Sequence, residues 1–369
     1  MIKILHIVSS LEYGGGVQTM LYNYYTNMNN EDICFDFIVH GNKKGEYEEL
    51  FGEMGSTIIH VTPKKKSLLK NLKEINHVML MKDYDIVHVH QNLSSGLSLL
   101  LAKIHNIPIR ISHSHSYKKN NSLLQTFKEF PLRFLNNNFS NYKFACERNA
   151  GKWLFGNTWE ENEYNLIMYN AIDLNKFSYN PKIRNNYREE LGLNNKFIML
   201  HIGRLSNEKN QEFSIEILKE LLSIEPNAVL LLVGSGNNEE KLKNIVQGKG
   251  LNNYVKFLGV RKDVSELMNA ADILLLPSKN EGLGMVAIEA QSCGLKVLAS
   301  DNVPRATNLT ELIEYLPLDS SINIWIEKII SSKSYKRKVL TENTKFGNYS
   351  IHVQAKKYEE WIIDRVLNK

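Results

Sequence analysis

Two carboxylates, Glu281 and Glu289, stand eight residues apart in the segment 277–290. Glu281 lies in a glycine-flanked loop, and Glu289 lies in the helix expected to follow it. Eight residues of helix rise about 12 Å, comparable to the span from the sugar to the ribose of a sugar nucleotide. Each carboxylate can accept hydrogen bonds from a pair of hydroxyls, while the helix N-terminus between them attracts phosphate. The alternative is that both are structural glutamates, bonded to neighbouring backbone or to an arginine.

Two cations, Arg204 and Lys209, follow the apolar run 197–202 and precede a segment of helical period. Arginine can bind two oxygens at once and lysine supplies a mobile point charge, so the pair suits a diphosphate. Cations at the start of a helix oppose the helix dipole, and a bound anion would remove that conflict. We therefore favour a diphosphate site over two ordinary surface cations.

Two glycine loops, 14–16 and 234–236, also follow apolar runs. Glycine lets the backbone approach a ligand closely. Neither loop completes the G-x-G-x-x-G pattern of dinucleotide-binding proteins, because Thr19 and Glu239 stand where the third glycine is needed. The sequence therefore disfavours an oxidoreductase, and the first loop is either a phosphate contact or a purely structural turn.

Short apolar runs alternate with segments of helical period along the whole chain, which is typical of β-α-β units in a parallel sheet covered on both faces. The pattern pauses at a polar stretch around 169–186 and then restarts. We therefore expect an α/β protein with two Rossmann-like domains facing across a cleft, and ligands at the carboxyl ends of the strands. The expected strands are 2–8, 34–39, 57–60, 86–90, 109–113, 142–145 and 165–168, then 197–202, 229–233, 255–258, 273–276 and 297–299.

The expected domains are 1–175 and 176–345, followed by a C-terminal segment, 346–369. Its residues 351–367 have an amphipathic helical pattern. We expect this helix to cross back and pack on the N-terminal domain.

The composition indicates an ordinary globular protein. The chain has 369 residues, of which 43% are apolar and 23% charged, and this excludes a disordered or low-complexity chain. Its three cysteines lie far apart, which argues against a disulfide scaffold or a cysteine-rich zinc site. No apolar run approaches the roughly 18 residues of a membrane span, and the first strand begins too early for a signal peptide. We therefore expect a cytoplasmic protein.

The net charge of +5 is unevenly spread. Residues 1–60 hold 3 Lys and Arg against 8 Asp and Glu, whereas residues 61–152 hold 15 against 5. The basic stretch would attract phosphates, and it contains an aromatic-rich segment that predicts a membrane-surface helix. The alternative is a helix packed on its own sheet with solvated lysines. No nucleic-acid recognition motif accompanies the charge. The residues proposed to meet the membrane or an acceptor are Lys118, Lys119, Phe127, Lys128, Phe130 and Arg133.

These motifs together resemble those of the retaining family-4 glycosyltransferases of GT-B fold, and most of all the capsular and exopolysaccharide (EpsF- and CapH-like) branch. The resemblance spans both domains and is most specific around the two glutamates. It is carried by the G-G-x-Q loop at 15–18, ACERNAGKWLFG at 145–156, MYNAIDLNKF at 168–177, GRLSNEKN at 203–210 and PSKNEGLGMVAIEAQSCGLKVLASD at 277–301.

The resemblance implies roles for individual residues. Glu281 would hold hydroxyls of the transferred sugar and Glu289 the ribose, while Arg204 and Lys209 would neutralise the leaving diphosphate. A histidine after an N-domain strand would touch the donor sugar; we prefer His115, and His113 stays open. The implied donor-binding set is completed by Gly15 and Gly16 from the N-terminal domain and by Gly203, Val260, Arg261, Gly282, Leu283 and Gly284 from the C-terminal domain.

The implied chemistry is hexosyl transfer with retained anomeric configuration, from a nucleotide sugar, most simply a UDP-sugar, to a glycan acceptor that is polyprenyl-diphosphate-linked, at the inner face of the membrane. No cofactor or metal is expected. Asp83-Tyr84-Asp85 matches the D-x-D string of metal sites, but it precedes a strand and is interpreted as a solvated turn. One departure is the segment 301–307, which replaces the family's glycine-rich, glutamate-containing loop and leaves its phosphate contacts open.

Two other function classes are compatible with these residues. Another GT-B sugar-nucleotide enzyme, such as an epimerase, would form product from the donor alone. A non-catalytic polysaccharide-assembly protein would bind no donor, although the four charged residues of the proposed donor site are all present.

Overall fold

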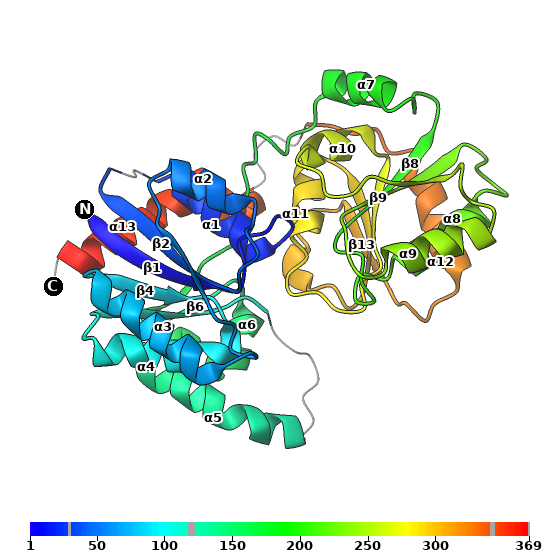
Figure 1. The fold of residues 1–369 in the computed structure, drawn as a ribbon. Coiled ribbons are helices and arrows are strands. Elements are labelled where there is room, and N and C mark those ends of the chain that lie inside the picture. Colours follow the sequence, from blue (N-terminus) through cyan, green and yellow to red (C-terminus); the bar gives the residue numbers. More distant parts are fainter. Residues whose placement is uncertain (29–30, 117–122, 340–343, 368–369) are drawn as a thin grey trace. The chain divides into compact units, whose positions relative to one another are not determined.

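The computed structural model describes residues 1–28, 31–116, 123–339 and 344–367, and the chain forms two compact units (Figure 1). The first unit comprises Met1–Ala171 and Asn348–Lys369, and the second comprises Ile172–Gly347. The sequence-based boundaries, 175/176 and 345/346, stand within a few residues of these positions.

The first unit is a parallel α/β sheet covered on both faces. Its seven strands are β1 (Ile2–Val8), β2 (Ile33–His40), β3 (Ile58–Val61), β4 (Ile86–Val89), β5 (Ile109–Ser114), β6 (Tyr142–Ala145) and β7 (Asn165–Ile167). They lie in the order β3-β2-β1-β4-β5-β6-β7, so the order reverses between β1 and β4 (Figure 1). Its helices are α1 (Gly16–Thr26), α2 (Tyr47–Glu53), α3 (Leu68–Met81), α4 (Gly96–Ile104), α5 (Leu123–Phe139), α6 (Arg148–Phe155) and α13 (Ile351–Leu367).

Alternation along the strands sends neighbouring side chains to opposite faces of this sheet. On one face, strand residues pack with Met20 and Tyr24 of α1, Phe51 of α2 and Ile362 of α13. On the other face they pack with residues of α3 and α4, including Ile75. The C-terminal helix is therefore part of the core of the first unit.

The second unit is also a parallel sheet between helices. Its six strands are β8 (Phe197–Ile202), β9 (Ala228–Val233), β10 (Val255–Phe257), β11 (Ile273–Leu276), β12 (Lys296–Ser300) and β13 (Ile313–Leu316), in the order β10-β9-β8-β11-β12-β13. Its helices are α7 (Pro181–Glu190), α8 (Gln211–Leu221), α9 (Glu239–Gly248), α10 (Val264–Ala270), α11 (Met285–Ser292) and α12 (Ile322–Ser332). Its core contains fully buried Leu230, Ile273 and Trp325.

The observed elements agree with the sequence pattern except at one edge strand. Apolar runs identify twelve of the strands to within one or two residues, because strands buried on both faces are almost continuously apolar. The sequence analysis missed β13. It is only four residues long and alternates buried Ile313 and Leu316 with half-buried residues between them, so it leaves no continuous apolar run.

In the part of the chain that the structure describes, no helix combines the length and the apolar character that crossing a membrane requires.

Candidate functional site

The carboxyl ends of β8 and β11 bring a lysine and a glutamate of the second unit together. Lys209 Nζ lies 2.5 Å from Oε1 of Glu281, and Ser278 Oγ donates to the same oxygen over 2.8 Å. The Glu281 side chain is only 5% exposed, so hydrogen bonds from these partners must replace those to water. Because β8 and β11 are neighbours in a parallel sheet, residues 72 positions apart in the chain meet at one edge.

Backbone contacts hold the two loops that carry these side chains. The Lys279 amide donates to the Glu208 carbonyl over 2.7 Å, and Asn210 Nδ2 donates to the Pro277 carbonyl over 3.1 Å. Asn210 adopts a left-handed conformation with φ 59°, which ends the loop and begins α8. The sequence analysis singled out Lys209 and Glu281 but missed Ser278, whose hydroxyl has no pattern of its own.

The glycine loop 234–236 packs against the backbone of residues 203–205, which leads into this site. A Cβ on Gly234 would lie 2.2 Å from the carbonyl oxygen of Gly203, and one on Gly236 would lie 2.3 Å from that of Leu205. Such distances are shorter than any real contact, so both positions require glycine. The loop is therefore structural: it lets the backbone at 203–205 sit close to the end of β9.

Arg204 and Gly203 stand on the loop that follows β8. The Arg204 side chain is exposed, and its carbonyl oxygen accepts from Gln211 Nε2 over 2.9 Å. The Lys209 stem passes over Gly203, with Cδ 3.4 Å from the position a Cβ would take. One exposed and one half-buried cation therefore stand at the same strand end.

Glu289 lies one turn inside α11, and Gly284 precedes that helix with φ 86°. The Glu289 carboxylate is partly buried, and burial raises its pKa to about 7, with Lys176 exerting a smaller opposite effect. Gln291 on the same helix donates to the Thr307 carbonyl over 2.8 Å and so ties α11 to the segment 301–310. Of the loop before α11, Leu283 is buried and Gly282 is half-buried.

In the segment 301–307, Arg305 is exposed, and its guanidinium lies 3.8 Å over the Tyr315 ring. Arg261, after β10, is similarly held: its Nε donates to Asp263 Oδ1 over 2.8 Å, and its guanidinium contacts the Tyr187 hydroxyl over 2.9 Å. The neighbouring Val260 side chain is 51% exposed. At 260–261, therefore, a largely exposed apolar side chain stands beside an arginine that is held by Asp263 and Tyr187 and is 34% exposed.

In the first unit, Gly15 and Gly16 differ in whether there is space for a side chain at their positions. A Cβ on Gly15 would collide with the Gln18 side chain, whose Nε2 donates to the Ser10 carbonyl over 2.7 Å. A Cβ on Gly16 would meet nothing within 4 Å, and Gly16 is exposed at the first position of α1. The loop is thus a tight turn at Gly15 and an open helix N-terminus at Gly16.

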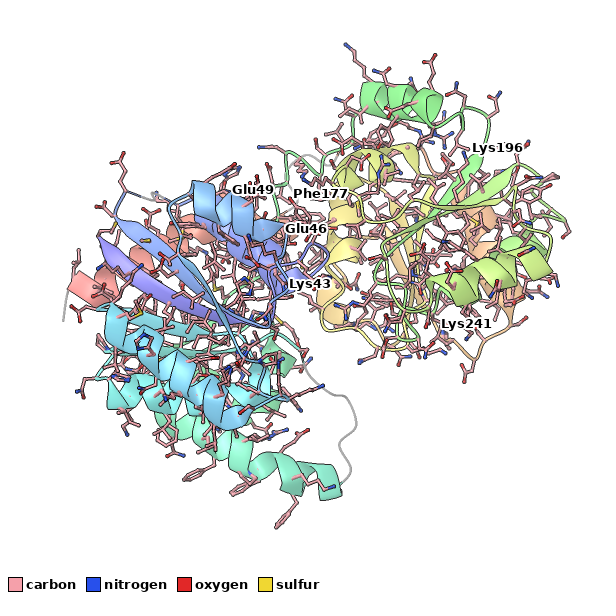
Figure 2. All side chains as sticks on the ribbon, viewed as in Figure 1. Lys43, Glu46, Glu49, Phe177, Lys196 and Lys241 are labelled. Carbon is pink, nitrogen blue, oxygen red and sulfur yellow. The ribbon has the colours of Figure 1, made fainter. Side chains whose placement is uncertain are left out.

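The segment 41–46 packs beside that glycine loop. Glu46 Oε2 accepts from the Tyr13 amide over 2.9 Å, and Lys43 forms an ion pair with Glu12; Figure 2 labels Lys43 and Glu46. These contacts tie the loop before α1 to the chain that follows β2.

The two candidate histidines differ in accessibility. His113, on β5, is completely buried, and its Nδ1 lies 3.0 Å from His88 Nε2. His115 follows β5, is partly exposed, and its Nε2 lies 2.9 Å from His90 Nδ1. Burial lowers the pKa of His115 to about 3 and that of His113 well below its usual value. Both imidazoles are therefore neutral near pH 7.

The histidines also form the groups in which a metal could be considered. Within the described residues, nitrogens of His6, His88 and His90 lie within 4.8 Å of one another, as do those of His90, His113 and His115. Hydrogen bonds engage both nitrogens of His88 and of His90. The nitrogens thus point at one another rather than at a shared centre. The D-x-D string forms no such group, because the Asp85 carboxylate accepts from the Lys3 amide over 2.9 Å.

Helix α5 carries the aromatic residues proposed for a surface role. Phe127 is 81% exposed, Phe130 66% and Phe134 55%, and Lys128 is exposed beside them. Arg133 is instead held against the protein, 2.9 Å from Glu129 Oε2 and over the Trp153 ring. The helix also packs on its own unit, where buried Asn136 accepts from the Ser112 hydroxyl of β5 over 2.8 Å, so the alternative of a helix packed on its own sheet with solvated lysines stays open. Lys118 and Lys119 lie outside the described residues.

Comparison with known proteins identifies the second unit. Residues 183–311 match the family model for glycosyl transferases group 1. The chain is 28% identical over 335 residues to the putative glycosyltransferase EpsF of Bacillus subtilis strain 168, covering 89% of this chain and 86% of that protein. It is 27% identical over 329 residues to the Escherichia coli UDP-Gal:alpha-D-GlcNAc-diphosphoundecaprenol alpha-1,3-galactosyltransferase, covering 82% of each.

The fold is shared with a protein whose structure has been solved in complex with UDP-glucose. The structure of Anabaena Alr3699/HepE in complex with UDP-glucose matches all of this chain and all of its own with a TM-score of 0.74, at 20% identity. The chain therefore has the GT-B fold and carries a group 1 glycosyl transferase domain in its second unit.

Proposed function

We propose that this chain, with its GT-B fold and its group 1 glycosyl transferase domain, transfers a hexosyl group from a nucleotide sugar to a glycan acceptor with retained anomeric configuration. The observation that carries the proposal is the convergence of Lys209, Ser278 and Glu281 at the carboxyl edge of the second sheet. Glu289 stands eight residues further along the chain, inside α11, and we assign it to the ribose hydroxyls.

Each charged group of this edge has a part in donor binding. Arg204 and Lys209 bind the diphosphate, and Glu281 accepts hydrogen bonds from hydroxyls of the sugar. Without a ligand, Glu281 neutralises the half-buried Lys209; a bound diphosphate lets this lysine bridge the carboxylate and the phosphate. Exposed Val260 and the backbone of Arg261 receive the base, and Glu289 receives the ribose hydroxyls.

The chemical step forms a bond from the acceptor oxygen to the anomeric carbon and breaks the bond from that carbon to the diphosphate. The acceptor's proton passes to the departing phosphate oxygen, on the same face of the sugar. The protein lowers the barrier by stabilising the charge that grows on the diphosphate and by positioning the acceptor. Arg204 and Lys209 supply the positive charge for this role.

The relatives indicate the substrates. The Escherichia coli relative is named for a UDP-sugar donor and a diphosphoundecaprenol-linked acceptor, and the HepE structure contains UDP-glucose. We therefore propose a UDP-sugar donor and a polyprenyl-diphosphate-linked acceptor in capsular or exopolysaccharide synthesis, with the protein bound peripherally to the inner face of the membrane. The exposed aromatic residues of α5 fit such an attachment, since rings of this kind insert at the lipid headgroup boundary.

Donor binding and transfer are tested together. Thermal unfolding is followed with UDP-, GDP- and ADP-sugars, and the matching donor is then incubated with and without a lipid-linked acceptor. We expect a UDP-sugar to raise the melting temperature and transfer to require the acceptor. Product from the donor alone would favour an epimerase, and no stabilisation by any donor would favour a non-catalytic assembly protein.

Removal of divalent cations is expected to leave transfer within about two-fold of its untreated rate, because protein cations hold the diphosphate in this proposal. Initial rates are compared after dialysis against EDTA and after adding back Mg²⁺ or Mn²⁺. A ten-fold or greater loss, restored by one of these ions, would contradict metal independence.

Substitution of Phe127 and Phe130 by serine is expected to lower binding to phosphatidylglycerol vesicles several-fold, because both rings are largely exposed on one helix. Leu69→Ser is the matched control, since Leu69 is 83% exposed on α3. Co-sedimentation measures the bound fraction. Equal binding of the double variant and the wild type would remove α5 from the membrane contact.

A further inference from the structure

Glu281 is held by the protein through one of its two carboxylate oxygens. Lys209 Nζ and Ser278 Oγ both contact Oε1, at 2.5 Å and 2.8 Å. Within the described residues, Oε2 receives no hydrogen bond, and it is not one of the buried side-chain atoms without a partner, so solvent reaches it. The carboxylate therefore has one oxygen fixed by the protein and one oxygen that can accept from a ligand hydroxyl.

Ser278 is fixed in turn by a serine of the neighbouring strand. Ser300 is the last residue of β12, and its Oγ donates to the Ser278 carbonyl over 2.5 Å. Both serines are completely buried. Because β12 pairs with β11 so that Ala299 lies opposite Leu276, Ser300 stands beside the chain that continues from β11. A hydroxyl on one strand thus contacts the residue that binds Glu281 on the other.

The contact from Ser300 fixes the orientation of residue 278. The residues on either side of Ser278 are bound from the opposite direction, by the loop that follows β8. A buried carbonyl that loses its donor costs free energy, so the backbone would turn toward another donor or admit water. Such a turn would move the Ser278 hydroxyl away from Oε1 of Glu281, although Lys209 could still hold that oxygen.

We propose that Ser300 is a positioning residue for sugar recognition: acting through Ser278, it holds Glu281 so that Oε2 faces a hydroxyl of the donor's sugar. This rests on the proposed function, in which Glu281 binds the sugar and other residues bind the nucleotide. Ser300 itself touches no ligand. Its loss should therefore weaken the binding of the sugar and spare the binding of the nucleotide.

Calorimetry with UDP-glucose, UDP-galactose and UDP separates these two contributions. We expect Ser300→Ala to weaken binding of the UDP-sugar about three- to ten-fold, the usual effect of one hydrogen bond, and to leave UDP within about two-fold. Ser300→Thr keeps the hydroxyl and should restore the affinity for the UDP-sugar. Ser332→Ala is the matched control: it removes a hydroxyl of α12 that donates to the Ile329 carbonyl over 2.6 Å, and it should change neither affinity.

A double-mutant cycle tests whether Ser300 acts through Ser278. Ser278→Ala removes the hydroxyl that contacts Glu281 and should also weaken the UDP-sugar while sparing UDP. In the double variant the two losses should not add, because both changes remove the same contact with Oε1. Additive losses, or equal weakening of UDP and the UDP-sugar in Ser300→Ala, would overturn the proposal.

Crystal structures without a ligand test the geometry separately. In Ser300→Ala we expect the Ser278 hydroxyl to leave Oε1 of Glu281 while Lys209 stays beside it. An unchanged contact between Ser278 and Glu281 would contradict the role of Ser300. Because these structures need no ligand, a wild-type protein that binds no UDP-sugar, together with the expected movement in Ser300→Ala, would contradict the proposed function and not this assignment.

Discussion

Removing the charge of Lys209 is expected to lower transfer by about 10²–10³-fold, the usual effect of losing one donor to a developing anion. The cleanest change is Lys209→Met, since the lysine stem packs over Gly203 and methionine can fill the same space. Its Nζ is the cation 2.5 Å from Glu281 at the proposed sugar and diphosphate site. Initial rates with a saturating lipid-linked acceptor measure the effect, and circular dichroism verifies the fold.

The matched control for this variant is Lys241→Ala. Lys241, on α9 of the same unit, is also paired with a glutamate (Figure 2). Its Nζ lies 2.5 Å from Glu212 Oε1. Its side chain is 57% exposed, so the pair contributes little to stability. We expect this variant to keep transfer within about two-fold. Equal activity of Lys209→Met and Lys241→Ala would remove Lys209 from the mechanism.

Glu281→Gln separates the two partners of the ion pair. Glutamine keeps the size of the side chain and an oxygen that can accept from Ser278, but it loses the charge that neutralises Lys209. Donor binding is then expected to weaken less than transfer. A double-mutant cycle with Lys209→Met measures the coupling, and for residues in one network we expect the two losses not to add.

The fold was largely predictable from the sequence, because strands buried on both faces leave apolar runs that can be counted. The run from Val229 to Val233 is an example: each of its residues is buried in β9. The edge strand β13 lacked that signal. The site was partly predictable, because Arg204, Lys209 and Glu281 are charged residues that follow strands, and ligands of parallel α/β sheets bind at the carboxyl ends of the strands.

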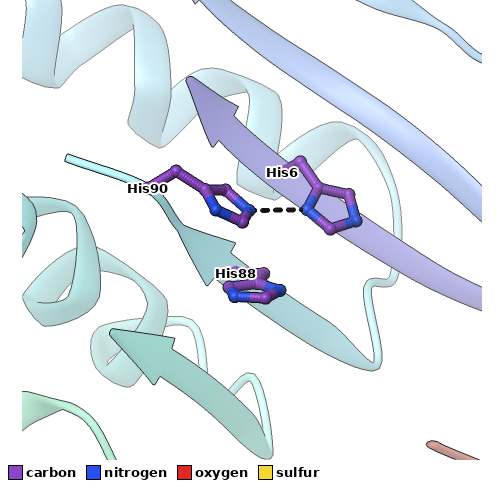
Figure 3. Close-up of side chains that lie close together, drawn as sticks. All are labelled: His6, His88 and His90. Carbon is purple, nitrogen blue, oxygen red and sulfur yellow. Dashed lines mark hydrogen bonds between the residues drawn. The ribbon is translucent and has the colours of Figure 1, made fainter. Parts of the chain in front are cut away.

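The remaining features depend on side chains meeting across strands, and no linear pattern gives that information. Examples are the contact of Ser278 with Glu281 and the hydrogen bonds that join His6 to His90 (Figure 3), His90 to His115, and His88 to His113. The alternations 88–90 and 113–115 did carry a signal, since a polar ring at every second position of a buried strand places both rings on one face. The requirement for Gly234 and Gly236 likewise appears only when the Gly203 and Leu205 carbonyls are placed against them.

The first unit is expected to lose stability steeply below pH 6.5. Five of its histidines lie close together, are neutral when the protein is folded and protonate when it unfolds: His6, His88, His90, His113 and His115. Burial lowers all five folded pKa values from 6.5. Below pH 6.5 the unfolded chain therefore binds more protons, and the free energy of unfolding falls as the pH falls. Each histidine contributes about 1.4 kcal/mol between pH 7.5 and 5.5, nearly all of it below pH 6.5, so the five together lower the free energy of unfolding by about 7 kcal/mol. That is comparable to the whole stability of a typical domain.

Other titratable groups of the first unit change this pH dependence of the free energy of unfolding only slightly. His40, whose pKa burial lowers to about 4, adds to the acid sensitivity, whereas Asp36, whose pKa is lowered from 3.8, does so only at about pH 4 and below. His60 and Glu147 oppose it, because their folded pKa values are raised and they bind protons more readily in the folded state. Two opposing groups cannot cancel the contributions of five histidines, so the first unit still loses stability as the pH falls.

The second unit supplies the internal control for this prediction, because His201 is its one histidine and contributes a single proton, with a folded pKa lowered to about 3. Hydrogen exchange followed by mass spectrometry resolves peptides from β4 and β5 and peptides from β8 and β9 in one sample. Between pH 7.5 and 5.5, after correction for the intrinsic exchange rate, protection should collapse in the first set and change little in the second, because Glu289, whose folded pKa is raised to about 7, takes up a proton in the folded second unit and offsets His201. Parallel losses in both sets would show that the cluster does not stay neutral in the folded protein, since only proton uptake confined to the unfolded first unit separates the two.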